Sequence, residues 1–413
     1  MAAGFVKNWF KDFRSLFVQE IKGLFTDGGV LLIFFVGGMG YPLLYNIIYY
    51  NGVIHDTPVA VVDMADCSAS RRFVQKVDAT REVEIAARCI DMEEARKLMQ
   101  DREVNGIIYF APDFGDRIAA GETAKVGIYA DMSSFLYYKN LLMGSSFVML
   151  DEIHEVEIER YEAAGFTSEE ISQLVTPIPY EENNPWNKAF SYTIFFISAA
   201  LLLVVQQSMF YGTTMRAGTL REEKHSFALS VGSLRGRGMG RIILGRGAAY
   251  WLPYMGIAMY IAFIVPAIFG FPQRGSWADI MVLLLFFVTD CVFFCQFWST
   301  FIDRRETVIV LLLFISPIVM FLTGFSWPET AFPTAWKALS YLFPSTFACR
   351  AFINLNTAGG DLSTVQGHIH ALAIQTCVYY LAECAMVYIE SFIIKHNGFE
   401  GGIQQLKSHL SRE

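Results

Sequence analysis

The sequence predicts an α-helical membrane protein with six transmembrane helices, an N-terminal interfacial helix and an inserted external α/β domain. Hydrophobic residues make up 54% of its 413 residues and charged residues only 17%, whereas soluble domains carry about 25% charged residues. Six long apolar runs each supply roughly the 20 residues that an α-helix needs to cross the hydrocarbon core. Between the first two runs, a long segment alternates strand-like and helix-like patterns instead.

Residues 1–28 predict a cytoplasmic amphipathic helix that lies in the membrane interface. Large apolar residues recur on one helical face, and Lys and Arg lie opposite. This face comprises Phe5, Trp9, Phe13, Leu16 or Phe17, Ile21 and Phe25. A cleaved secretory signal would show a short apolar core and a small-residue cleavage site, and this stretch has neither.

The six predicted transmembrane helices cover residues 29–50, 189–211, 245–268, 279–301, 307–324 and 370–394. Basic residues are unevenly shared between the two sides of such a bundle. Sixteen Lys and Arg lie on one side, in the N-terminal segment, after the second helix, after the fourth helix and in the tail 395–413, whereas the short loops opposite hold three. The positive-inside rule therefore predicts a multi-pass protein of the cell inner (plasma) membrane with both termini in the cytoplasm.

The segment 51–188 predicts a periplasmic α/β domain. Strand patterns occur at 57–63, 82–89, 104–110 and 124–130, with helical patterns between them and a long helix at about 133–164. Alternating strands and helices indicate a largely parallel sheet. The segment holds 25 acidic and 13 basic residues, which argues against nucleic acid as a partner.

This domain shows no catalytic constellation, so binding or docking is the expected role. Its histidines, His55 and His154, are isolated. Cys67 and Cys89 could pair in an oxidising compartment. Spacing along the chain does not fix their Cα separation, so the sequence leaves the pairing open.

The chain lacks the motifs of an ATPase. It contains no G-x-x-x-x-G-K-[ST] phosphate loop and no Gly-Lys pair. The glycine-rich stretch 233–247 neither follows a strand nor fits G-x-G-x-x-G. His368 and His370 have no further ligand nearby at metal-site spacing. We therefore expect a non-enzymatic chain with no catalytic residue, metal or bound cofactor.

Residues 324–350 combine an apolar composition with three prolines. Prolines interrupt helices, yet the stretch GFSWPETAFPTAWKALSYLFPSTFACR is too apolar for an ordinary solvated loop. Non-helical backbone at membrane depth is tolerated where it is packed in protein or lines a wet cavity. Residues 325–369 are therefore predicted to be an apolar, interrupted segment on the outer side. The alternative is an interfacial cap without a transport role.

Three stretches and the layout together resemble the type-2 permeases of the ATP-binding cassette superfamily, in the drug-export-like branch with a large external domain after the first span. IHDTPVAVVDMADCSASRRFVQKVD (54–78) is similar to that family's segment after its first span, and VNGIIYFAPDFGDRIAAGETAKVGIYAD (104–131) is similar to its strand, P-x-x-F, helix and strand unit. The third stretch resembles the family's G-F-x-x-P … P … P-x-T passage. On that pattern fall Gly324, Phe325, Pro328, Pro333, Pro344 and Thr346. The resemblance implies that residues 325–369 form a re-entrant or outer segment that dips back into the outer leaflet, with Trp327 and Trp336 at the headgroup level.

The resemblance implies the membrane subunit of an exporter. Such a subunit moves an amphipathic or lipid-like compound, such as a drug-like molecule or a lipid, out of the cytoplasm or inner leaflet. ATP and Mg²⁺ are then bound by a separate cytoplasmic ATPase subunit. The further partners implied are a second permease copy or paralogue, in a homo- or heterodimer, and membrane lipids, with a periplasmic adaptor protein as an additional candidate.

The family's coupling loop corresponds to residues 212–244 here. It usually reads R-E-x-G-T-x-E-x-L-x-x-x-P, and this chain has MRAGTLREEKHSFALSVGSLRGRG, with Ser230 and glycines where the proline is expected. The implied coupling residues are Gly218, Thr219, Leu220, Glu222, Glu223, Phe227 and Leu229. The alternative is a basic loop that rests on anionic headgroups.

Asp290 and Glu383 fall inside the fourth and sixth predicted helices. A charge near the bilayer centre costs at least about 2.5–3.5 kcal/mol on insertion scales, so both should face the bundle or a cavity. They could line a substrate path or serve as packing carboxyls. Two rival functions stay open: a non-transporting receptor that senses a ligand through the external domain, and a proton-coupled carrier.

Overall fold

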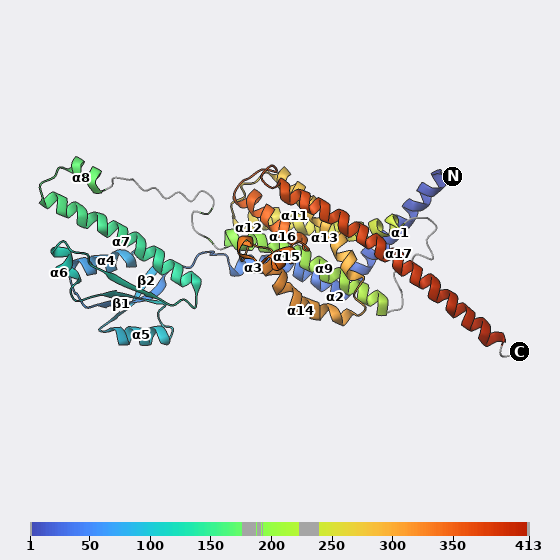
Figure 1. Ribbon diagram of the computed structural model, residues 1–413, viewed down its shortest axis with the longest axis horizontal. Helices are drawn as coiled ribbons and strands as arrows, with labels where there is room; N and C mark the ends of the chain where they lie inside the picture. The colour runs from blue at the N-terminus through green and yellow to red at the C-terminus, as the bar shows by residue number, and fades with distance from the viewer. Residues whose placement is uncertain (1, 176–186, 188–190, 192, 223–238, 411–413) are drawn as a thin grey trace. The chain divides into compact units, whose positions relative to one another are not determined.

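The computed structural model describes residues 2–175, 187, 191, 193–222 and 239–410. The chain divides into two compact units, which are an α/β unit (53–184) and a helical unit (1–52 and 185–413) (Figure 1).

The α/β unit is built on a four-stranded sheet in the order β2-β1-β3-β4. Its strands are β1 (Thr57–Asp63), β2 (Val83–Cys89), β3 (Gly106–Phe110) and β4 (Val126–Ala130). Strand β1 runs parallel to β2 and β3, and β4 is antiparallel to β3. The strands lie where the alternating pattern predicts them, and β1 has the predicted bounds.

Helices cover both faces of this sheet. The helices are α4 (Ser68–Asp78), α5 (Met92–Gln100), α6 (Phe114–Ala119), α7 (Phe135–Ala163) and α8 (Ser168–Val175). Residues of α4, α6 and α7 share one apolar core with Val59 and Val61, whereas α5 shares a second core with Ala60 and Val62. Because β1 is buried on both faces, it reads as a continuous apolar run.

The two cysteines considered as a pair are free and belong to different cores. Cys67 caps the N-terminus of α4, where its Sγ accepts a hydrogen bond from the Ser70 N–H, and it packs against the α4 side of the sheet. Cys89 ends β2 on the α5 side. The sheet therefore lies between them, and no disulfide forms in this structure.

The helical unit contains α1 (Ala2–Thr26), α2 (Gly28–Leu32), α3 (Tyr41–Ile48), α9 (Ser198–Glu222), α11 (Gly240–Met259), α12 (Val265–Phe269), α13 (Trp277–Ser299), α14 (Arg305–Leu322), α15 (Thr334–Ser340), α16 (Pro344–Phe352) and α17 (Gln366–Leu410). Short π-helical stretches are η1 (Ile33–Gly40), η2 (Thr193–Ile197), η3 (Tyr260–Ile264) and η5 (Ile353–Thr357), and η4 (Glu329–Ala331) is a single 3₁₀ turn. Helix α17 continues well beyond the predicted end of the sixth span at 394.

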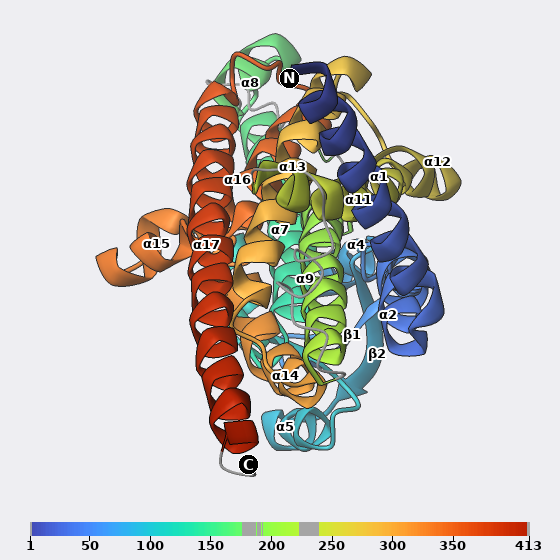
Figure 2. The same ribbon diagram turned by 90° about the vertical axis from the view of Figure 1, so that its right-hand side faces the viewer.

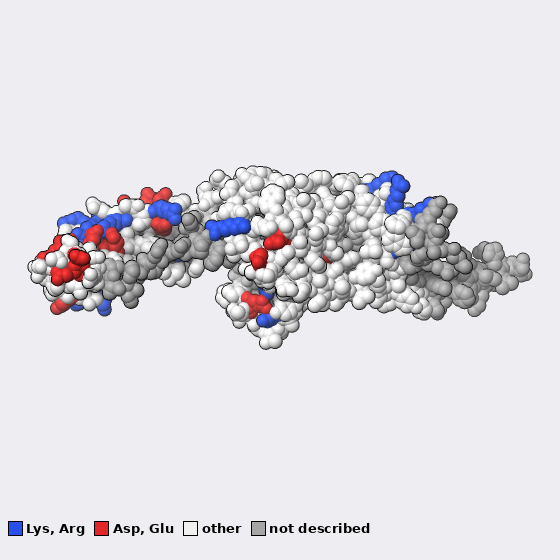
Figure 3. All heavy atoms as spheres, turned by 90° about the horizontal axis from the view of Figure 1, so that it is seen from above, with Lys and Arg blue, Asp and Glu red and all other residues white. Residues whose placement is uncertain are grey.

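Within the described residues, four helical stretches are long and apolar enough to cross a membrane, namely Gly28–Ile48, Gly240–Phe269, Trp277–Ser299 and Gln366–Ile389. A fifth is α14, which bends by 42° between Arg305–Leu311 and Leu313–Leu322. Figure 3 shows that the surface over the middle of the helical unit carries few charged atoms, whereas the α/β unit carries many of both signs.

Helix α9 overlaps the predicted span 189–211 and is not in that set, which covers the described residues alone. It packs against α2, η1, α11, α13, α14 and α16 (Figure 2). Most of its residues are buried. Gln206, Thr213 and Thr214 lie inside this packing, where other protein atoms bond them. A helix enclosed by other helices does not need the apolar surface that lipid requires.

Helix α1 packs along α11 through a face that includes two acids. Asp12 and Glu20 are both 6% exposed. The Asp12 carboxylate pairs with Arg241 Nε at 3.1 Å, and the Glu20 carboxylate pairs with Arg246 Nε at 2.5 Å. Because charges are buried only when they are paired, these contacts fix how α1 lies on the bundle. The amphipathic pattern did not indicate them.

Candidate functional site

A cavity of about 600 Å³ lies in the helical unit between three segments. The continuous stretch of α2, η1 and α3 forms one wall, α9 with Phe196 of η2 the second, and Ser316, Pro317 and Met320 of α14 the third. We call it the α9 cavity. Its volume lies in the range of small-molecule sites, which are about 300–1,000 Å³.

The wall from the first span is wider than an α-helix. Residues Ile33–Gly40 are π-helical, and Gly37 of this stretch lines the α9 cavity. A π-turn enlarges the helix locally, and such turns occur frequently at functional sites.

The lining is mainly apolar, with a few polar groups on α9 and α14. Gln207, Ser208 and Tyr211 contribute from α9, and Ser316 from α14. Among the described residues, the Gln207 side-chain N–H₂ has no hydrogen-bond partner. A buried amide donor without a partner costs about 1–3 kcal/mol, so a ligand acceptor bonded there would be favoured. The arrangement suits a largely apolar molecule with a polar group.

A polar cluster joins one end of the same three segments. Both oxygens of Asp27, which caps α2, accept hydrogen bonds from the Arg305 guanidinium of α14, at 2.7 and 3.1 Å. The Thr219 hydroxyl of α9 donates a hydrogen bond to the Asp27 carboxylate and accepts one from the Arg305 guanidinium, each at 3.3 Å. The Arg305 backbone N–H donates to Glu222 at 2.8 Å. We call these four residues the Asp27 cluster.

The charged form of Asp27 is stabilised within this cluster. Burial raises the pKa of the carboxyl, but the Arg305 hydrogen bond and charge and the Val30 and Gly29 N–H groups outweigh it. The pKa of Asp27 therefore lies below its ordinary value of 3.8. The ion pair is present at neutral pH.

The predicted coupling residues lie partly in this region. Gly218, Thr219, Leu220 and Glu222 occupy the last turns of α9 rather than a loop. A Cβ on Gly218 would lie 2.8 Å from the Arg305 backbone nitrogen and 2.9 Å from the Arg304 carbonyl carbon, so a glycine is needed for α9 to approach α14. Leu220 is half-buried. The remaining three, Glu223, Phe227 and Leu229, lie outside the described residues.

Asp290 and Glu383 are both buried, at 0% and 1% exposure, yet neither lines the α9 cavity. Neither Asp290 carboxylate oxygen has a hydrogen-bond partner among the described residues. Glu383 instead interacts electrostatically with Arg246, the partner of Glu20. The structure therefore gives the two predicted path residues different surroundings.

The predicted outer residues form a compact turn and helix arrangement. Gly324 follows α14 with a φ of 85°, a left-handed conformation that favours glycine. Phe325 is buried, and its ring packs edge-to-face against the ring of Phe196, with 5.0 Å between the ring centroids. Pro328 and Pro333 are the N-cap residues of η4 and α15, and Pro344 is the first residue of α16, where a proline ring suits the helical backbone. Trp327 is exposed.

Helix α16 is almost fully enclosed by α9, α13 and α17. Its buried N-terminus is satisfied from α9, because the Ser345 N–H donates to Gln206 Oε1 at 2.7 Å. The Thr346 hydroxyl donates to the Ser340 carbonyl at 2.7 Å. The outer segment is thereby attached to α9, the helix that also lines the cavity.

Glu329 is the centre of a second polar group in this segment. It accepts hydrogen bonds from Tyr341 at 2.7 Å and pairs with Lys337 at 3.0 Å and with Arg350. Arg350 also donates to the Thr323 carbonyl at 2.9 Å, which closes the turn at Gly324. Burial raises the pKa of Glu329, but the Tyr341 and Lys337 hydrogen bonds and the Arg350 charge outweigh it, so its pKa lies below 4.5.

Sequence reasoning missed Asp27, Gln207 and Arg305. Asp27 does carry a local signal, because Asp directly before Gly-Gly at the start of an apolar run is a helix N-cap pattern. Its pairing with Arg305 joins residues 278 positions apart, which no local pattern reveals.

Comparison with known proteins assigns the family. A family model described as ABC-2 family transporter protein matches residues 29–383, which include the first apolar helix, the α/β unit and every residue of the α9 cavity. None of the curated proteins compared with the chain matches it significantly. The chain therefore belongs to the ABC-2 family of transporter proteins, as a multi-pass membrane subunit of an ABC transporter that pairs with an ATP-binding cassette ATPase.

Proposed function

We propose that this chain is the permease of an ATP-driven exporter and that the α9 cavity receives an amphipathic or lipid-like compound. The observation that carries the proposal is the cavity itself, with apolar walls and the unpaired Gln207 amide. An apolar wall favours hydrocarbon or ring surface, and the amide selects a molecule that also carries an acceptor. ATP and Mg²⁺ are bound by the partner ATPase.

The proposed topology has six spans, with α9 as the enclosed one, both termini in the cytoplasm and the α/β unit outside. The positive-inside distribution supports it, because the short predicted outer loops carry three of the Lys and Arg residues and the predicted inner segments carry sixteen. In this topology α16 is a re-entrant element of the outer leaflet. A second permease copy or a paralogue completes the transporter.

Coupling is proposed to run from the ATPase through the segment after α9 into the Asp27 cluster. The cluster ties together the ends of the three segments that line the α9 cavity. A displacement of the end of α9 therefore changes the positions of α2 and α14, and with them the cavity. Substrate moves only if the two resulting states bind it differently.

The test is transport by the complete assembly. The affinity-tagged chain is purified with its ATPase, reconstituted in liposomes, and assayed with a fluorescent phospholipid and an amphipathic dye. Val204→Trp fills the α9 cavity from α9, and it should reduce substrate-stimulated ATP hydrolysis and transport by about tenfold or more, since binding and transport share the cavity.

The matched control is Leu381→Trp. Leu381 is 66% exposed on the outside of α17, so the same added ring meets no cavity wall there. Both variants should assemble with the ATPase. If Val204→Trp transports both probes as well as Leu381→Trp does, the cavity is not the substrate site.

A further inference from the structure

The lining of the α9 cavity carries polar groups but no charge. Among the described residues that line it, none is Asp, Glu, Lys, Arg or His. Its polar groups belong to three tyrosines, two serines and one glutamine, namely Tyr41, Tyr45, Tyr211, Ser208, Ser316 and Gln207. Phenol, hydroxyl and amide groups are uncharged at neutral pH, so the wall offers hydrogen bonds and no countercharge.

Charged groups elsewhere in the described helical unit do not supply this countercharge. In the Asp27 cluster, which joins one end of the same three segments, the Asp27 carboxylate and the Arg305 guanidinium are already paired with each other. Asp290 and Glu383 do not line the cavity. An ion that entered the α9 cavity would therefore leave water without gaining a partner of opposite charge.

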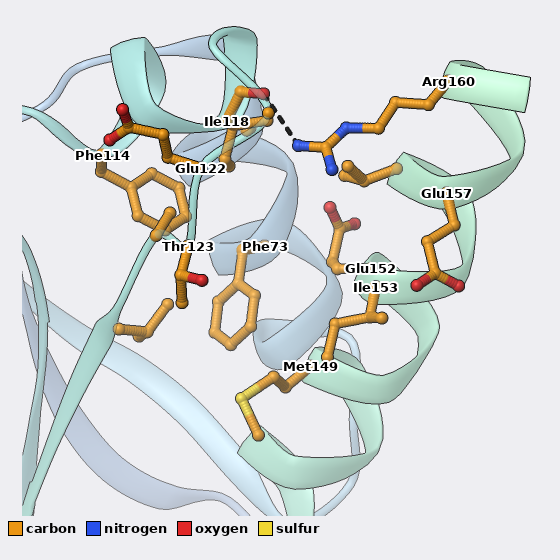
Figure 4. Close-up of a pocket in the computed structure, with 15 residues that line it drawn as sticks. Phe73, Phe114, Ile118, Glu122, Thr123, Met149, Glu152, Ile153, Glu157 and Arg160 are labelled. Carbon is orange, nitrogen blue, oxygen red and sulfur yellow. Dashed lines mark hydrogen bonds between the residues drawn. The ribbon is translucent and has the colours of Figure 1, made fainter.

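An uncharged lining is not a general property of cavities in this chain. The α/β unit has a cavity of about 340 Å³ on the side of the sheet covered by α4, α6 and α7 (Figure 4). Charged residues are part of its lining, namely Glu122, Glu152, Glu157 and Arg160. The α9 cavity is larger, at about 600 Å³, and has none. This difference limits the compounds that the α9 cavity can hold.

We propose that the α9 cavity selects amphiphiles whose polar end is uncharged, such as alcohols, esters and amides. This inference rests on the proposed function, in which the cavity is the substrate site. The uncharged polar end exchanges hydrogen bonds with water for hydrogen bonds with the wall, and the hydrocarbon or ring part contacts the apolar side chains.

An organic cation would gain some attraction from the tyrosine rings. Tyr41 and Tyr45 are neighbours on α3, with 4.8 Å between their ring centroids, and Tyr41 is 40% exposed. The face of such a ring attracts a cation, but this attraction is smaller than the cost of burying an ion that has no carboxylate partner. An anion gains no such attraction. We therefore expect the cavity to favour neutral compounds over cations, and cations over anions.

Three probes with the same ring and chain separate charge from shape. They are pyrenebutanol, pyrenebutyltrimethylammonium and pyrenebutyrate, which are neutral, cationic and anionic. The chain is purified with its ATPase in nanodiscs of zwitterionic lipid, and probe-stimulated ATP hydrolysis is measured against the lipid-bound probe concentration, which pyrene fluorescence reports. We expect the half-maximal concentration to be about tenfold lower or more for the alcohol than for the cation, and highest for the carboxylate.

A variant that adds a charge tests the physical cause. Ala200 lines the cavity from α9, and Ala200→Arg places a permanent positive charge in that wall. It should lower the half-maximal concentration of pyrenebutyrate about tenfold or more and raise that of the cation. Ala200→Met is the matched control, because it adds a long side chain without a charge. It should leave the order of the three probes unchanged.

The outcomes separate this inference from the proposed function. Equal stimulation by the three probes, a stronger response to a charged probe, or no response to pyrenebutanol would overturn the inference. If Val204→Trp abolishes the stimulation in such a case, the cavity is still the substrate site. Stimulation that persists in Val204→Trp would instead contradict the proposed function. Should Ala200→Arg fail to assemble with the ATPase, the order of the probes on the native assembly decides.

Discussion

Gly218 shows how the absence of a side chain allows two helices, α9 and α14, to approach each other closely. The backbone of Arg304 and Arg305 comes so close that a methyl group on residue 218 would have to displace main-chain atoms. We expect Gly218→Ala to cost about 1–3 kcal/mol of stability, as overpacking does, and to lower the thermal unfolding temperature of the chain.

Gly256→Ala is the control for this substitution. It also lies inside a helix, α11, and a Cβ there would meet no other atom within 4 Å. Because alanine favours helix, this variant should be neutral or more stable by up to about 1 kcal/mol. Equal unfolding temperatures for the two variants would mean that α9 and α14 are not held at this distance.

Asp290 and Glu383 should respond differently to loss of charge. Glu383→Gln removes an acid that interacts with Arg246, so it should reduce stability by about 1–3 kcal/mol. Asp290→Asn removes no hydrogen bond seen among the described residues, and it should leave stability unchanged while reducing transport if the carboxyl lies on the substrate path. Unfolding curves and transport assays of both variants test this. Normal transport by Asp290→Asn would assign Asp290 to packing.

Glu329 makes the outer segment sensitive to acid. Since its folded-state pKa lies below the unfolded value of about 4.5, its charge contributes stability above that value, and this contribution is lost as the pH falls through the folded-state pKa. At neutral pH, hydrogen exchange of residues 324–350 should be faster in Glu329→Gln than in the native chain. The difference should shrink below pH 4.5. A difference that is independent of pH would exclude the carboxylate as its cause.

At the scale of elements, the Asp27 cluster connects three segments that meet only in the folded chain. Arg305→Gln should reduce substrate-stimulated ATP hydrolysis, because α14 is released from α2 and α9. The neighbouring Arg304→Gln is the control, since Arg304 is exposed and forms no ion pair within the described residues. In a double-mutant cycle, Asp27→Asn and Arg305→Gln should be strongly non-additive. Additive effects would contradict a shared role.

The elements also show what sequence patterns can predict. Strand β1 has its predicted bounds because a short buried apolar run is a property of seven consecutive residues. The buried acids of α1 form ion pairs with residues more than 200 positions away in the sequence. The sequence therefore indicates only that this face of α1 is polar. The apolar run predicts a span that ends at 211, whereas α9 continues to Glu222 through polar residues such as Thr213 and Thr214, which neighbouring helices enclose. The α9 cavity needs three distant segments at once and has no local signature.

At the scale of the whole molecule, the unequal distribution of charge predicts which parts face which compartment. The helical unit exposes apolar side chains along α2, α14 and α17, as expected for a surface in lipid. The α/β unit is acidic, and a long soluble domain can be translocated whatever its charge. The shorter basic segments therefore determine the orientation, and the α/β unit is expected outside.

Labelling with a membrane-impermeant maleimide tests this orientation. Glu103→Cys and Arg14→Cys place single new thiols on the α/β unit and on α1, at positions that are both exposed, and the native chain sets the background of its own cysteines. In intact cells or spheroplasts, Glu103→Cys should be labelled, and Arg14→Cys should react only after lysis. The reverse pattern would place the α/β unit in the cytoplasm. Labelling of both before lysis would show that α1 is not on the cytoplasmic side, and the coupling route through the end of α9 would then have no access to an ATPase.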